Sequence, residues 1–98
     1  MKSIVEKVVG QGGYNSSWVH PVLELIARES SFNPNAKNSK STAAGLFQFL
    51  DQTRADYGGN KVDWSDPTQQ VIAGLKYIKQ RYGTPEKALK HWDDKGWY

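Results

Sequence analysis

The sequence predicts an all-α fold. Apolar residues recur every three to four positions in several segments, and helix start and stop signals stand at the ends of those segments. No run alternates apolar and polar residues between hairpin turn signals. We therefore expect a compact helical domain.

The first predicted helix carries Ile4, Val5, Val8 and Val9 on one face. It stops in residues 10–13, where three of the four residues are glycine.

The second predicted helix runs from Trp18 to about Glu29. Ser17 is the predicted cap, and Pro21 falls in the first turn, where a missing N–H is tolerated. Residues 30–35 end the helix, because the proline in this stretch disfavours helical backbone in the residue before it.

A polar loop is predicted over residues 37–42, followed by a short apolar segment over residues 43–50 that contains one buried-looking amide. Asp51 is the predicted cap of a brief helix that ends near Tyr57.

Two further helices have clear signals. Asp66 as cap, with proline at the first helical position and glutamine three residues after the cap, begins a helix that Gly83 ends. Its predicted inner face is formed by Val71, Leu75, Ile78 and Tyr82. Residues 84–86 repeat the start signal for a last helix through Ala88, Leu89 and Trp92.

Composition limits the function classes. The 98 residues are expected to form one domain (1–98), and the absence of cysteine excludes a disulfide scaffold and a thiolate metal site. The net charge of +3 comes from scattered residues, so neither a nucleic-acid partner nor a membrane partner is expected. No signal peptide is apparent at the start of the chain. We therefore expect export by another route, or a domain of a longer chain.

One carboxylate stands out. Helical spacing places Glu29 inside the apolar arc of its helix, beside Val22 and Ile26, where an unpaired charge costs several kcal/mol. Two interpretations stay open. Glu29 either pairs with a base such as Arg28 or Arg54, or reaches water at the helix end. Alternatively it is a general acid whose pKa is raised by apolar walls.

Three ordered motifs surround this residue. Residues 28–36 read Arg-Glu-Ser-Ser-Phe-Asn-Pro-Asn-Ala, residues 44–49 read Ala-Gly-Leu-Phe-Gln-Phe, and residues 82–98 run from Tyr-Gly-Thr-Pro-Glu to Gly-Trp-Tyr. The glutamate and the glutamine of the first two lie 19 positions apart. The chain, roughly over residues 18–98, resembles the lysozyme-like soluble lytic transglycosylase (SLT) family, in its phage-tail and Gram-positive cell-wall form. Members of that family cleave bacterial peptidoglycan.

The resemblance implies a small lysozyme-like, SLT or goose-type-like fold with a central catalytic helix and an active-site cleft. It implies that Glu29 is the single catalytic acid/base and that Gln48 binds sugar or its N-acetyl group. Leu50 would line the cleft, and Ser39, with Ser41 as the alternative, would be the loop serine that contacts substrate. The other residues expected at the substrate are Phe47, Trp92 and Tyr98.

The chain departs from the family in its last motif. Many members have Ala-Tyr-Asn-Ala-Gly, whose tyrosine hydroxyl bonds the catalytic glutamate, whereas residues 90–94 here read Lys-His-Trp-Asp-Asp. Trp92 has a donor N–H but no hydroxyl, and His91 or Tyr98 are the alternative replacements. The sequence leaves the partner of Glu29 open.

The expected function is cleavage of the MurNAc-β-1,4-GlcNAc bond of peptidoglycan glycan strands by a monomer or a domain of a longer chain, leaving 1,6-anhydro-MurNAc ends. No cofactor and no metal are expected. The place of action would be extracellular, at the cell wall or on a virion. Two alternatives stay open: a muramidase that uses the same Glu29, and a non-catalytic wall-binding or phage-tail module.

Overall fold

The computed structural model describes residues 1–95 and confirms the all-α prediction. Five α-helices and two short 3₁₀ turns make up this part of the chain, which contains no strand, only isolated bridges that join Ala44 to Lys37 and to Phe49. The α-helices are α1 (Lys2–Gln11), α2 (Val19–Ser30), α3 (Asp51–Asp56), α4 (Pro67–Arg81) and α5 (Pro85–Lys95). The 3₁₀ turns are η1 (Ser16–Trp18) and η2 (Gly59–Lys61).

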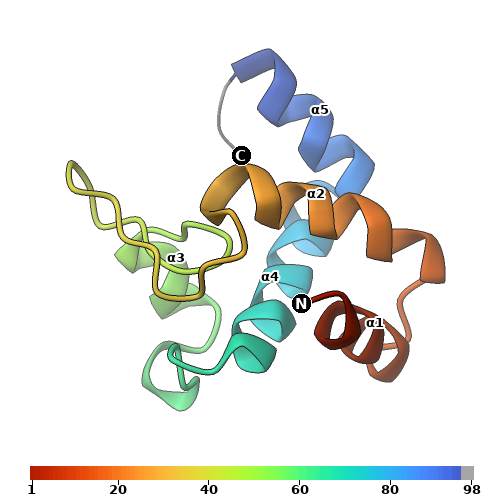
Figure 1. The fold of residues 1–98 in the computed structure, drawn as a ribbon, viewed down its shortest axis with the longest axis horizontal. Helices are drawn as coiled ribbons and strands as arrows, with labels where there is room; N and C mark the ends of the chain where they lie inside the picture. Colours follow the sequence, from red (N-terminus) through yellow and green to blue (C-terminus); the bar gives the residue numbers. More distant parts are fainter. Residues whose placement is uncertain (96–98) are drawn as a thin grey trace.

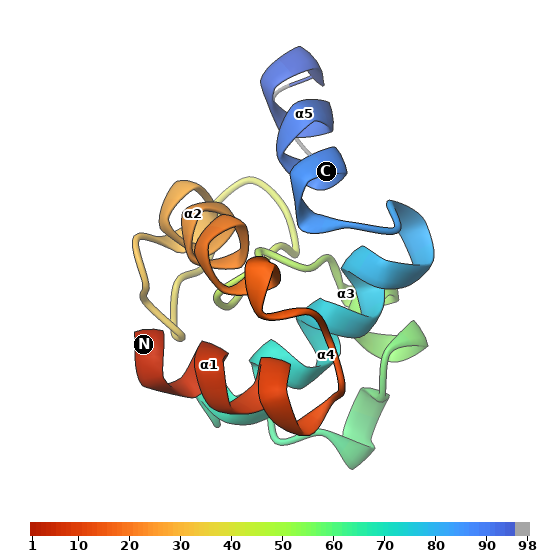
Figure 2. The same cartoon turned by 90° about the vertical axis from the view of Figure 1, so that its right-hand side faces the viewer.

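Helix α4 runs through the middle of the molecule (Figure 1). Helix α1 packs against α4 and α2, and α5 packs against the same two helices. The long loop between α2 and α3 lies on the opposite side of α4 from α1, and α3 follows it there (Figure 1). In both ribbon views α5 extends beyond the other helices (Figures 1 and 2).

The apolar faces of these helices meet in one core. Val5, Val22, Leu25, Leu75 and Ile78 are fully buried, which confirms the predicted inner faces of α1, α2 and α4. The same cluster takes in Leu46, Phe47 and Phe49 from the long loop. The loop that carries the second motif is therefore anchored in the core.

The helix ends agree with the sequence where capping is explicit. Asp66 accepts a hydrogen bond from the N–H of Thr68 at the start of α4, and Gly83 follows α4 with a φ of 87°, as predicted.

Two predicted caps are wrong. The N–H of Ser17 donates to the side chain of Asn15, which caps η1, so Ser17 is not the cap of α2. Asp51 lies inside the first turn of α3 and pairs with Arg54, because an acidic side chain there can bond a base one turn later.

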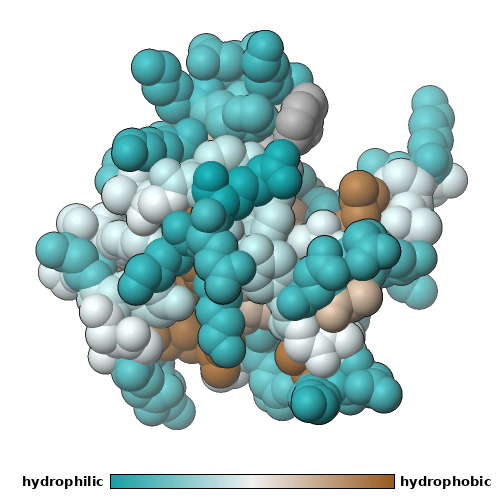
Figure 3. Space-filling model, turned by 180° about the vertical axis from the view of Figure 1, so that it is seen from behind, coloured by the Kyte–Doolittle hydropathy of each residue, from teal (hydrophilic) through white to brown (hydrophobic). Residues whose placement is uncertain are grey.

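The face seen from behind is mostly hydrophilic, with small separate apolar areas among the polar ones (Figure 3). None of the helices in residues 1–95 is long and apolar enough to cross a membrane.

Candidate functional site

Glu29 lies in the last turn of α2, half-buried, on the same side as the fully buried Val22 and Ile26. Burial of its carboxyl group disfavours the charged form and raises the pKa of Glu29 above its usual value. The sequence placed this side chain on the apolar arc, and the structure agrees.

Trp92 is the hydrogen-bond partner of Glu29. The indole N–H of Trp92, on α5, donates to Oε1 of Glu29 over 2.5 Å. This bond favours the carboxylate and partly offsets the effect of burial, yet the pKa stays raised. An aromatic N–H thus stands where many SLT proteins have the tyrosine hydroxyl, and the ring of His91 lies instead against Tyr82.

A cation clamps the two helices together beside this bond. Arg28 contacts Glu24 on its own helix (2.8 Å) and Asp93 on α5 (2.6 Å), and its guanidinium carbon lies 5.0 Å from the centre of the Trp92 ring. The Arg28 clamp therefore holds the Trp92 ring from one face. Asp93 lies in α5, so this ion pair joins two helices.

The interpretation that Glu29 is neutralised by a base is wrong for the two bases considered. Arg28 pairs with Glu24 and Asp93, and Arg54 pairs with Asp51 and with backbone carbonyl groups of the long loop. Within residues 1–95, Glu29 forms no ion pair, so its carboxyl group keeps the features of a general acid.

Backbone strain is concentrated in the first two motifs. Among residues 1–95, three non-glycine residues have positive φ angles: Ser31 (51°), Phe32 (65°) and Gln48 (52°). Such conformations persist only where the surrounding structure holds them, and they often lie at functional sites. The reversal of the chain directly after Glu29 depends on the first two.

The side chains of the first motif divide between scaffold and surface. Ser30 donates to the carbonyl of Ile26 and so serves the helix end. Asn33 accepts from the N–H of Asn35 in a local turn. The side chain of Phe32, a residue with positive φ, is 43% exposed.

Gln48 holds the long loop together. Its amide NH₂ donates to the carbonyl oxygens of Gly45 (2.9 Å) and Ala36 (3.2 Å). Its carbonyl oxygen accepts no hydrogen bond from residues 1–95. The side chain thus has a structural role in the loop, beside the substrate role that the resemblance implies.

The predicted substrate-binding residues of the long loop differ in exposure and in hydrogen bonding. Leu50 is 50% exposed and lines a hollow of about 200 Å³ with Gln48 and Tyr77. Ser39 is exposed in the loop, whereas the hydroxyl of Ser41 accepts from the N–H of Ala43.

Phe47 was expected at the substrate, but its side chain is only 3% exposed. The ring packs so tightly on Gly74 that a Cβ there would lie 2.3 Å from it. Its position in the core explains the burial. Tyr98, also expected at the substrate, lies outside the described residues.

Sequence reasoning missed Gln70. Its buried side chain accepts from the N–H of Leu46 (2.7 Å) and donates to the carbonyl oxygens of Pro34 (3.0 Å) and Trp64 (2.7 Å). One amide therefore joins the first two motifs to the segment before α4. Gln70 lies roughly 100° from Val71 around the helix, at the edge of the predicted inner face, and this position only weakly predicts a buried side chain.

Four of the aspartates have local partners. Asp51 pairs with Arg54, Asp56 accepts from Gln52, Asp63 accepts from Ser65, and Asp66 caps α4. Among residues 1–95 no group of three His, Cys, Asp or Glu side chains is placed to hold a metal ion. The described contacts bring no second carboxylate to Glu29.

Comparisons with known proteins agree with this arrangement. The family model described as "Transglycosylase SLT domain" matches residues 11–93. The chain is similar to "Probable transglycosylase IsaA" of Staphylococcus haemolyticus (strain JCSC1435), with 29% identity over 96 residues. This match takes in 98% of the chain but only 34% of the relative, so the chain spans about a third of the length of that protein. No solved structure matches significantly. These comparisons do not support the phage-tail part of the expectation.

Proposed function

Because the chain belongs to the transglycosylase SLT domain family, we propose that it is a peptidoglycan lytic transglycosylase in which Glu29 is the single acid/base. The observation that carries the proposal is the environment of that carboxyl group. It is half-buried, forms no ion pair within residues 1–95 and is bonded by the N–H of Trp92, with a raised pKa. We further propose that residues 1–98 form one catalytic domain that acts on glycan strands at the cell wall.

The first step is acid catalysis. Protonated Glu29 gives its proton to the oxygen that links MurNAc to GlcNAc, and the bond from that oxygen to the anomeric carbon breaks. The carbonyl oxygen of the MurNAc N-acetyl group stabilises the positive charge that develops. Gln48 orients this group. The Trp92 N–H stabilises the carboxylate that the first step leaves on Glu29.

The second step uses the same residue as a base. Ionised Glu29 takes the proton of the C6 hydroxyl of the same sugar while O6 attacks the anomeric carbon, which gives a 1,6-anhydro ring and restores protonated Glu29. The nucleophile is tethered, so no carboxylate is needed to activate water. Five aspartates, Asp51, Asp56, Asp63, Asp66 and Asp93, have partners other than Glu29, which supports a one-carboxylate mechanism, because ordinary glycoside hydrolysis uses two.

Mass spectrometry of digested cell walls, with and without borohydride reduction, tests the proposal. We expect 1,6-anhydro-MurNAc ends, which borohydride leaves unchanged. Reducible MurNAc ends as the main product would instead indicate a muramidase that uses Glu29. Unchanged walls would indicate a non-catalytic wall-binding module.

A further inference from the structure

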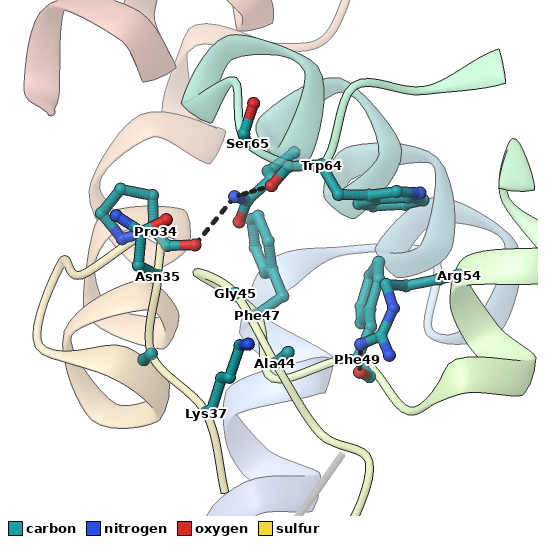
Figure 4. Close-up of a pocket in the computed structure, with 12 residues that line it drawn as sticks. Pro34, Asn35, Lys37, Ala44, Gly45, Phe47, Phe49, Arg54, Trp64 and Ser65 are labelled. Atoms are coloured by element: carbon teal, nitrogen blue, oxygen red, sulfur yellow. Dashed lines mark hydrogen bonds between the residues drawn. The ribbon is translucent and has the colours of Figure 1, made fainter. Parts of the chain in front are cut away.

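A pocket of about 290 Å³ lies beside the candidate site, and neither Glu29 nor Gln48 lines it. Phe47 forms its centre, Pro34 and Asn35 lie on one side, and Trp64 and Phe49 lie on the other (Figure 4). Its volume is near the lower end of the range for small-molecule sites. The pocket therefore suits a ligand of one or two small residues.

One polar group in the pocket is available to a ligand of opposite charge. The side-chain amide of Gln70 already forms hydrogen bonds with three backbone groups. The guanidinium group of Arg54 already bonds Asp51 and two carbonyl oxygens of the loop. The ammonium group of Lys37 points toward the centre of the pocket (Figure 4) and has no partner among residues 1–95. The pocket thus combines aromatic walls with one free cation.

This combination selects for a small apolar group next to a carboxylate. An apolar group gains by covering the half-buried ring of Trp64 and the small exposed parts of Phe47 and Phe49. A carboxylate gains a charge-assisted hydrogen bond from Lys37. A neutral sugar ring fits less well, because it offers no negative charge to Lys37.

The pocket and Gln48 share a wall. Ala36 and Gly45 line the pocket, and their carbonyl oxygens accept the two hydrogen bonds of the Gln48 amide. A peptide of four residues spans up to about 14 Å when extended, so a peptide attached to a sugar at Gln48 can pass over this wall.

We propose that this pocket binds the carboxylate end of the peptidoglycan stem peptide, with the methyl group of its terminal D-alanine on the aromatic rings and its carboxylate on Lys37. The choice of this occupant rests on the proposed function, because stem peptides are attached to the MurNAc residues of that substrate. The pocket would make the enzyme prefer glycan strands whose stems end in a free carboxylate.

Binding is tested on the full chain carrying Glu29→Gln, by nuclear magnetic resonance titration with the free tetrapeptide L-Ala–D-Glu–L-Lys–D-Ala. Lys37→Ala removes the cation, and Ala44→Leu fills the pocket while keeping the backbone bridges of residue 44. Lys61→Ala is the matched control, since this exposed lysine does not line the pocket. The carboxamide form of the peptide and inorganic phosphate are the comparison ligands. Circular dichroism checks that each variant is folded.

We expect saturable shifts centred on Ala44, Gly45 and Ser65. Lys37→Ala, Ala44→Leu and the carboxamide should each weaken binding at least tenfold, and Lys61→Ala should leave it unchanged. An unchanged affinity in Lys37→Ala would overturn the proposal. Absence of saturable binding, an equal loss in Lys61→Ala, or equally tight binding of phosphate would also overturn it.

The test separates this inference from the proposed function, because the free peptide has no glycosidic bond. Wall cleavage is measured separately, on the chain that keeps Glu29. If that chain cleaves walls but the peptide does not bind the pocket, the pocket assignment alone is refuted. If the peptide binds but the chain with Glu29 leaves walls uncut, the lytic activity alone is refuted.

Discussion

Replacing Trp92 by phenylalanine should shift the pH dependence of activity upward. The substitution keeps an aromatic ring for Arg28 to cover but removes the N–H that donates to Glu29. That N–H favours the carboxylate, so without it the pKa of Glu29 rises further. The protonated acid then persists to higher pH, and the alkaline limb of the profile follows it.

The size of the shift can be worked from the contact. A hydrogen bond to a charged group contributes about 1.5–3 kcal/mol, and one pKa unit corresponds to about 1.36 kcal/mol. Glu29 is only half-buried, so water replaces part of the lost stabilisation and the lower end of that range applies. We expect the limb to move up by about one pH unit. Turnover should also fall, because the carboxylate formed in the first step loses its donor.

The assay is wall cleavage against pH, analysed as kcat/KM, which reports the free enzyme. Trp18→Phe is the matched control, because it removes an indole from the buried core, and its limb should stay in place. A limb that does not move in Trp92→Phe, or that moves to lower pH, would refute the reasoning.

Four further outcomes follow from the contacts. Arg28→Ala should lower turnover but change the melting temperature little. The Trp92 ring loses the guanidinium group that covers it, whereas ion pairs of exposed side chains contribute little to stability. Gln48→Ala should reduce the free energy of unfolding by about 1–3 kcal/mol as well as turnover, since two loop carbonyl groups lose a donor. Denaturant titration should show a larger loss, about 3 kcal/mol, for Gln70→Ala, which leaves one buried and two part-buried backbone groups without their partner. Glu29→Gln should gain stability relative to wild type as pH rises from 4 to 8. The reason is that a raised carboxyl pKa gives stability that is present at low pH and lost as pH rises through that pKa. Melting curves across this range should show a difference that grows with pH.

The fold was readable where the sequence has explicit local signals. Asp66 with the proline after it, and Gly83 with its positive φ, mark the ends of α4 because both act through the backbone nearby. Ser17 and Asp51 failed as predicted caps, since Asn15 precedes one and Arg54 competes for the other. Several polar residues near a helix start can accept the same backbone hydrogen bonds, and residue type alone does not predict which of them does so.

The sequence predicted the position of Glu29 on its helix, but not the side chains that contact it or hold the neighbouring loops. Helical angle alone placed Glu29 on the apolar face of α2, because that depends on one helix. The contact with Trp92 spans 63 positions and the side-chain role of Gln70 links it to residues up to 36 positions away. Such contacts arise from packing between elements, which periodicity does not encode. For the same reason the burial of Phe47 against Gly74 was not foreseen.

The most direct test of the central claim is wall cleavage by Glu29→Gln, followed as loss of turbidity. The amide keeps the shape of the side chain but has no acid proton to give to the leaving oxygen. General acid catalysis contributes about 10²–10⁴-fold, so we expect cleavage to fall at least a hundredfold in a folded protein. Glu6→Gln, an exposed change on α1, should cleave like wild type. More than a tenth of wild-type cleavage in Glu29→Gln would contradict the account.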